Sequence, residues 1–166
     1  MPICFSEPQA RCWTNSSHLL ECNPMASVHD IVAYIVQSLG PTSAMKLEKL
    51  VYYSQAWSLV WDSKPLFSAR VEAWASGPVV PALYRHHRGQ FEVTSWPLGN
   101  PQNLRSFERE SVDAVLKFYG DKTPFWLSEL THREQPWLDA RRGLAPGERG
   151  QTEITHAAMA EYYGSL

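Results

Sequence analysis

Apolar positions recur at helical spacing along most of the chain after Met25. The first run covers residues 28–39, where apolar side chains return once per helical turn, with Ser27 as a capping residue before it and Gly40-Pro41 as a stop. A second helix is predicted from about Ser43 to Trp61, and its apolar residues cover most of its circumference. Because a helix that is apolar nearly all round is a buried one, we expect this helix at the centre of the fold.

Alternation of apolar and polar positions predicts a small β element after that helix. Residues 69–74, ARVEAW, alternate as a half-buried strand does. Ser76-Gly77-Pro78 has the composition of a turn and is predicted to end this strand. Residues 91–96, FEVTSW, have strand composition too, and we expect the two strands to pair with each other.

The remaining helices are predicted from capping and breaking residues. They are a short helix over residues 81–87 ended by Gly89, a long one over 106–119 ended by Gly120, one that starts at Thr123-Pro124, a short one over 136–142, and a last one from Thr155. Together these predictions describe a mainly α (α+β) fold, a helical single domain with a small antiparallel β element over residues 25–166.

Composition is that of an ordinary globular protein. The chain has 166 residues, a formal net charge of -2 and 12% aromatic residues, including seven Trp. That length suits one domain with its own core. The charge disfavours a protein that binds nucleic acid through a strongly basic surface. No run approaches the roughly 20 apolar residues that a membrane-spanning helix needs, so no membrane partner is expected.

The three cysteines, Cys4, Cys12 and Cys22, all lie before Met25. They lack the close pairs typical of zinc sites, and they provide no disulfide framework, which suits a cytoplasmic protein. We therefore expect no metal and no cofactor. Residues 1–24 lack the apolar core of a signal peptide, and we interpret them as a flexible N-terminal extension or as the product of a start codon placed too far upstream.

A small hydrolase or transferase is one function that residue chemistry leaves open. Its acid–base group would be His132, with Glu129 and Glu72 as supporting carboxylates. The chain has no His-Glu-x-x-His pattern and no nucleophile elbow, so catalysis is not favoured and no catalytic residue is assigned.

A regulator that binds nucleic acid is the other alternative. Arg85, His87 and Arg88 form a short basic cluster that would contact phosphates. The sequence contains no helix-turn-helix pattern or other recognisable nucleic-acid module, which disfavours this function as well.

Three segments, in order along the chain, carry a family resemblance. They are MKLEKLVYYSQAW at residues 45–57, PLFSARVEAWASGPVVPALY at residues 65–84 and LSELTHREQPWLDAR at residues 127–141. Together they resemble the Panacea antitoxin domain, also called the SocA-like antitoxin family and formerly a phage-associated domain of unknown function. The resemblance covers the chain from about Met25 onward. The matching positions, which serve as scaffold or as contacts, include Leu50, Tyr52, Gln55, Trp57, Glu72, Gly77, Pro78, Tyr84, Thr131, Pro136 and Trp137.

The resemblance implies an antitoxin of a bacterial or phage-related toxin–antitoxin system, not an enzyme. Members of this family bind a protein toxin encoded beside them, and one branch also delivers its toxin to a bacterial protease as an adaptor. We therefore expect a cognate toxin encoded nearby as the partner, with a protease as a second partner and a homo-oligomer left open. The residues that we predict to contact the toxin are Lys46, Lys49, Tyr53, Trp74, Arg85 and His132.

Overall fold

Helices dominate the structure. The computed structural model describes residues 25–166, so the predicted N-terminal extension, residues 1–24, lies outside the described range. The α-helices of residues 25–166 are α1 (Val28–Leu39), α2 (Ala44–Trp61), α3 (Pro81–His87), α4 (Ser106–Tyr119), α5 (Pro124–Thr131), α6 (Gln135–Ala140) and α7 (His156–Gly164), with a short 3-10 helix at Pro101–Asn103. The mainly α class with a small antiparallel β element is confirmed.

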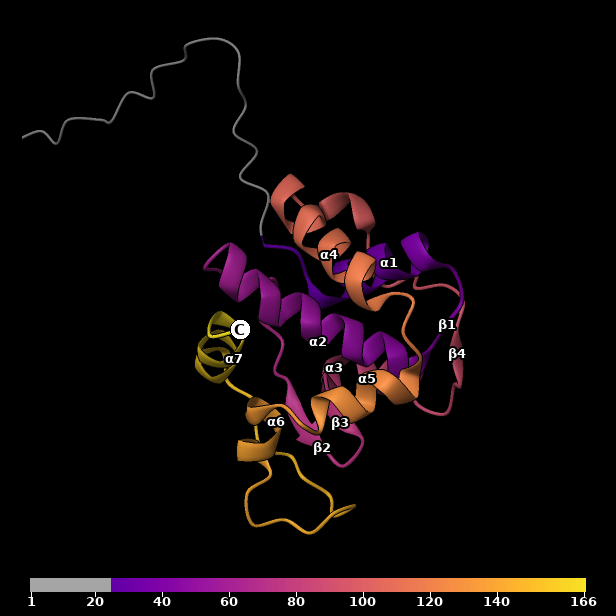
Figure 1. Cartoon of the computed structure of the whole chain (residues 1–166). Helices are drawn as coiled ribbons and strands as arrows, with labels where there is room; N and C mark the ends of the chain where they lie inside the picture. The colour runs from indigo at the N-terminus through magenta and orange to yellow at the C-terminus, as the bar shows by residue number, and fades with distance from the viewer. Residues whose placement is uncertain (1–24) are drawn as a thin grey trace, which may run out of the picture.

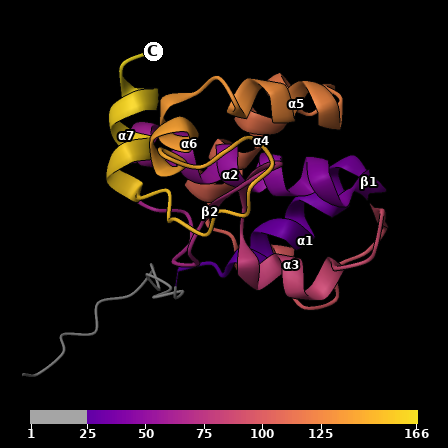
Figure 2. The same ribbon diagram turned by 90° about the horizontal axis from the view of Figure 1, so that it is seen from below.

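Helix α2 runs through the centre of the fold (Figure 1). Helices α1, α4, α5 and α7 contact it, as does strand β3 (Gly77–Val79). Figure 2 shows α5 and α1 on opposite sides of it. Leu47, Leu50 and Val51 are completely buried, and so are the polar side chains of Ser54 and Gln55. The prediction of a central buried helix is therefore confirmed.

Residues at the predicted helix starts cap their helices. A hydroxyl oxygen accepts a backbone N–H of the first turn at Ser27 for α1, Ser43 for α2, Thr123 for α5 and Thr155 for α7. These local bonds satisfy donors that the helix itself leaves free, which explains why the helix starts are readable from sequence.

The hairpin that follows α2 differs from the prediction. Strand β2 (Glu72–Trp74) pairs antiparallel with β3, and Trp74 lies opposite Gly77, so the turn consists of Ala75 and Ser76 alone. The prediction that Ser76-Gly77-Pro78 forms the turn is wrong in extent, because Gly77 and Pro78 belong to β3. Gly77, the first residue after the turn, has a positive φ of 109°, a conformation that residues with a Cβ rarely adopt.

The predicted pairing of the two strand-like segments is also wrong. Strand β4 (Glu92–Val93) pairs with β1 (Thr42–Ser43), the two residues before α2. Residues 152–154 occupy the other edge of β2 instead, where the Ala73 N–H donates to the Thr152 carbonyl at 2.9 Å. This edge is therefore filled by a segment that lies far along the chain, which no local pattern indicates.

Buried hydroxyl and carboxyl groups join α7 to the rest of the fold. The hydroxyls of Tyr53 on α2 and Tyr163 on α7 both donate to Oε2 of Glu134, at 2.9 and 2.6 Å. Glu134 precedes α6 and is 5% exposed. Burial raises its pKa to about 7, against the opposing effect of the two hydroxyl donors.

Candidate functional site

The family-like segments meet where the hairpin packs on the start of α2. The Lys49 ammonium donates to the Pro78 carbonyl at 2.9 Å and so ties the central helix to β3. A Cβ atom built on Gly77 would lie 2.6 Å from Cε of Lys49 and 2.9 Å from Oγ1 of Thr131. Gly77 therefore leaves room for the Lys49 side chain, and the Pro78 carbonyl accepts a hydrogen bond from the Lys49 ammonium.

Lys49 is an unusual lysine because its side chain is buried. It is 1% exposed, and burial lowers its pKa to about 8, while the neighbouring Glu48 charge opposes that shift. Buried lysines are rare unless another group compensates their charge. Lys49, which we predict as a toxin contact, lies beneath the surface.

Glu48 is bound on both of its carboxylate oxygens. Oε1 lies 2.6 Å from Nε2 of His87 on α3, and Oε2 accepts the Val80 N–H at 2.8 Å. Both side chains are buried, with Glu48 at 3% and His87 at 5% exposure. The pair joins α2 to α3, and in the described residues neither Glu48 oxygen is hydrogen-bonded to Lys49.

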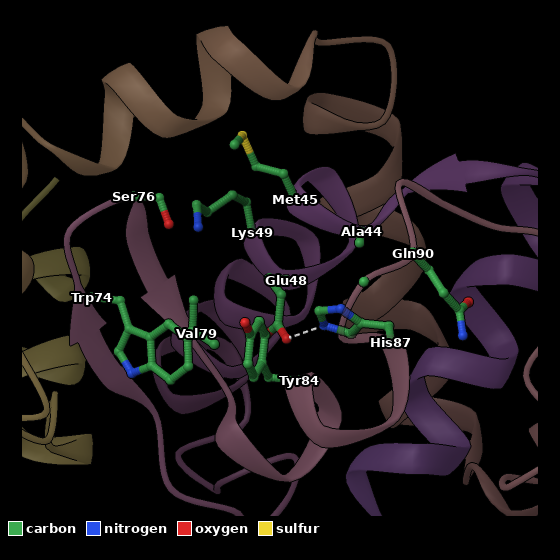
Figure 3. Close-up of a pocket in the computed structure, with 11 residues that line it drawn as sticks. Ala44, Met45, Glu48, Lys49, Trp74, Ser76, Val79, Tyr84, His87 and Gln90 are labelled. Atoms are coloured by element: carbon green, nitrogen blue, oxygen red, sulfur yellow. Dashed lines mark hydrogen bonds and ion pairs between the residues drawn. The ribbon is translucent and has the colours of Figure 1, made fainter. Parts of the chain in front are cut away.

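A pocket of about 180 Å³ opens between these elements (Figure 3). Its lining residues are Ala44, Met45, Glu48, Lys49, Trp74, Ser76, Val79, Tyr84, His87, Gly89 and Gln90. The Lys49 side chain extends toward Ser76 and away from the Glu48–His87 pair. Trp74 and Tyr84 make an edge-to-face contact with ring centroids 4.7 Å apart. Met45, Ser76 and Gln90 are exposed, so the pocket opens to solvent at these residues.

The third family-like segment supports the hairpin from the other side. The Trp137 indole donates to the Trp74 carbonyl at 2.9 Å, and the His132 ring stacks on Trp137 at 4.3 Å. Nε2 of His132 is buried and has no hydrogen-bond partner within residues 25–166. Burial lowers the His132 pKa, and the Lys49 charge adds to this effect, while Glu129 opposes it.

The other predicted contact residues divide between surface and interior. Arg85 is exposed on α3, and Trp74 is half-buried at the pocket. Lys46 is half-buried and donates to the Gly120 carbonyl at 2.6 Å. Tyr53 is completely buried in the Glu134 cluster. Tyr53 therefore has an internal role in the isolated chain, whereas Lys49, although buried, lines the pocket.

Most of the other matching positions lie inside the fold. Oε1 of Gln55 accepts the N–H groups of Leu66 and Phe67, and its Nε2 donates to the Phe67 carbonyl. The Trp57 indole donates to the Tyr119 hydroxyl at 3.2 Å. Among the remaining matching residues, Leu50, Tyr52, Gly77, Pro78, Thr131 and Pro136 are buried. These positions hold the central helix to its neighbours.

The comparison with protein families agrees with the motifs. The model of the family described as "Antitoxin SocA-like, Panacea domain" matches residues 47–138. The chain belongs to this family. Searches of curated proteins and of solved structures found no match. The matched stretch begins in α2 and ends in α6, so the Panacea region contains the hairpin and all of the pocket lining except Ala44 and Met45.

The structure does not assemble the residues of the enzymatic alternative. Nδ1 of His132 lies 3.8 Å from Glu129, but Glu72 pairs with Arg70 at 3.1 Å and accepts the Trp74 indole N–H. Within residues 25–166, no hydrogen bond or ion pair joins Glu72 to His132. This Panacea chain therefore shows no acid–base arrangement of these three groups.

The basic cluster is likewise divided. Arg85 and Arg88 are exposed, whereas His87 is buried against Glu48. The His87 ring is therefore not available to a phosphate. Its neighbour His86 faces another part of the molecule, where it contacts His29 and Trp96.

The Glu48–His87 pair has no signal in the sequence. The two residues are 39 positions apart, and each belongs to a segment whose pattern is explained by its own helix. The adjacent histidines do indicate that only one of them can face α2. Nothing in the sequence indicates that its partner would be the glutamate inside the KLEKL segment.

Proposed function

We propose that this Panacea-family protein is the antitoxin of a toxin–antitoxin pair and that it neutralises a protein toxin encoded nearby by binding it directly. The family match over residues 47–138 is the observation that carries the proposal. It fits a site whose groups make internal contacts and form no assembled catalytic set in the described residues.

Exposed aromatic side chains are available on the surface to contact a partner protein. Phe118 on α4 is 63% exposed, and Phe125 and Trp126 on α5 are 73% and 41% exposed. Aromatic residues supply much of the affinity in protein interfaces, and a standard interface covers roughly 800 Å² on each partner. Of the predicted contacts, Lys46, Trp74, Arg85 and His132 are at least partly accessible, and we propose them for toxin binding at the surface.

The cytoplasm is the proposed location. No helix in residues 25–166 has the length and apolar character to cross a membrane. A toxin that acts on intracellular targets and its antitoxin must meet before the toxin reaches its target, which requires both in the same compartment.

Growth of a bacterial host tests the proposal. The product of the neighbouring gene is induced alone and then together with this protein. We expect the neighbour to stop growth and the co-expressed protein to restore it. A harmless neighbour, or one that kills in both cases, would overturn the antitoxin function for this chain.

Blocking and protease delivery are separated in the same cells. A protein that only blocks its toxin leaves the toxin level unchanged, whereas an adaptor lowers it. The toxin level is measured by immunoblot after co-expression, in a host with and without its ATP-dependent cytoplasmic proteases. We propose direct binding as the common step of both mechanisms.

A further inference from the structure

The Lys49 ammonium has hydrogen-bonding capacity that the described chain does not use. An ammonium has three N–H donors. Within residues 25–166, Lys49 makes one hydrogen bond, to the Pro78 carbonyl, and the hydrogen bonds of the adjacent Glu48 go to His87 and to the Val80 N–H. A buried cation in this state favours an additional acceptor, because a buried charge without hydrogen bonds is costly.

The pocket beside Lys49 has the size of one side chain. Its volume of about 180 Å³ lies below the roughly 300–1,000 Å³ that is usual for pockets that hold small molecules. Trp74 and Tyr84 line it with aromatic surface. Met45 at its edge is 44% exposed and offers apolar surface to whatever carries the inserted group.

The charges around the pocket favour an anion. Arg85 on α3 and Arg88 directly after it are exposed, and α3 also contributes Tyr84 and His87 to the pocket. The Glu48 carboxylate also lines the pocket, and its charge raises the Lys49 pKa, but its printed hydrogen bonds go to His87 and to the Val80 N–H and not to Lys49. The cation that an incoming side chain would meet inside the pocket is therefore Lys49, with the two arginines outside the lining.

We propose that this pocket receives the carboxylate of an Asp or Glu side chain of the toxin, which binds the Lys49 ammonium while the adjoining toxin segment lies on Met45. The inference rests on the proposed function, since it names the chemistry of the toxin group that the site recognises. Lys49 thus contacts the toxin from below the surface, through the pocket.

Proton uptake gives this contact a signature of its own. The Lys49 pKa of about 8 means that the amine is partly neutral above pH 8. A carboxylate bound beside it favours the charged form, so binding takes up protons in that range. Calorimetry at pH 8.5 in two buffers of different ionisation enthalpy measures this uptake.

The test uses the full chain and the purified product of the neighbouring gene. The affinity of the two proteins for each other is measured by calorimetry. Lys49→Met keeps the length of the side chain and removes the charge. We expect the variant to bind with a dissociation constant at least about 30-fold larger than that of the unmodified chain. We also expect the proton uptake on binding to disappear. Thermal unfolding checks that the variant is folded.

A pair of variants at the pocket edge remains informative even if Lys49→Met does not fold. Met45→Glu and Met45→Lys place opposite charges at the same exposed position. We expect the glutamate variant to bind at least about tenfold more weakly than the lysine variant, because only the glutamate repels a carboxylate.

The outcomes separate the two proposals. If the unmodified chain does not bind the neighbour, the proposed function fails and this inference falls with it. If the chain binds, but Lys49→Met binds equally well or the two Met45 variants weaken binding equally, the antitoxin function survives and the carboxylate pocket is wrong.

Discussion

Lys49 and Gly77 share a space in which one extra carbon atom does not fit. The lysine end lies against the glycine, and its ammonium is bound to the carbonyl of the next residue, Pro78. At this scale the Gly-Pro step has two tasks: its glycine has no side chain to displace the lysine, and its proline carbonyl accepts the lysine N–H.

Gly77→Ala is therefore expected to destabilise the protein. The methyl group would lie 2.6 Å from Cε of Lys49, and the backbone φ of 109° is strained for any residue with a Cβ. We expect a loss of about 2–4 kcal/mol in the free energy of unfolding, measured in urea.

Gly89→Ala is the matched control for that variant. Gly89 has a positive φ of 82°, and a Cβ atom there would meet nothing within 4 Å. Backbone strain alone should cost about 1 kcal/mol. Equal losses in the two variants would show that the contact with Lys49 is not what excludes a side chain at Gly77.

Glu134 makes stability depend on pH. Burial raises the carboxyl pKa from 4.5 to about 7 in the folded chain. The folded state therefore holds this proton more tightly than the unfolded state does, and the stability from the protonated carboxyl is complete below pH 4.5 and is lost as pH rises through 7. We expect Glu134→Gln, which does not titrate, to reduce the fall in unfolding free energy between pH 5 and pH 8 by roughly 1–3 kcal/mol. An unchanged pH profile in the variant would contradict this assignment.

At the scale of elements, one side chain of α2 holds the loop that follows the helix. The Gln55 amide bonds to backbone groups of Leu66 and Phe67, and the chain can turn back from α2 toward β2 because of these bonds. The loop has its own apolar anchors too, since both residues are buried. The amide therefore sets the path of the backbone, while burial supplies the attraction.

Gln55→Met tests whether the amide contributes to holding the loop beyond the burial of Leu66 and Phe67. The substitution keeps the size of the side chain and leaves two N–H groups and one carbonyl buried without their partner, which should cost about 2–4 kcal/mol of unfolding free energy. Gln37→Met on α1, at an exposed position, should change stability by less than about 0.5 kcal/mol. Chemical denaturation measures the unfolding free energy of both variants. A similarly small loss in both would mean that the loop is held by burial alone.

At the scale of the whole molecule, the family-like segments form the interior and the first and last helices close it. Helix α1 contributes Ile31, Val32 and Ile35 to the core, and α7 contributes Met159 and Tyr163. Both helices lie outside the stretch matched by the family model. The chain on either side of the matched region is therefore part of the same hydrophobic core.

We predict that a chain consisting of residues 25–166 folds and neutralises the toxin as well as the full chain does. The core begins immediately at Ala26 and Val28, with Ser27 capping α1. Thermal unfolding and the growth assay, each run on both chains, check this prediction. A folded short chain that does not restore growth would show that residues 1–24 take part in neutralisation.

Local patterns predicted much of the fold and less of the site. The helix starts at Ser27, Ser43, Thr123 and Thr155 follow from caps that act within one turn, so they could be predicted. The pairing of β4 with β1 could not, because a strand two or three residues long carries too little pattern to select its partner.

By itself, the sequence determined the helical class, the buried central helix and, through three motif segments, membership of the Panacea family. These follow from periodicity, capping and residue identity, which act over short stretches of chain. Only the tertiary structure decided that Lys49 is buried against Pro78, that Glu48 pairs with His87, and that a pocket lies between them. Those facts depend on contacts between residues 29 and 39 positions apart, and packing of the whole core sets which side chains meet over such separations.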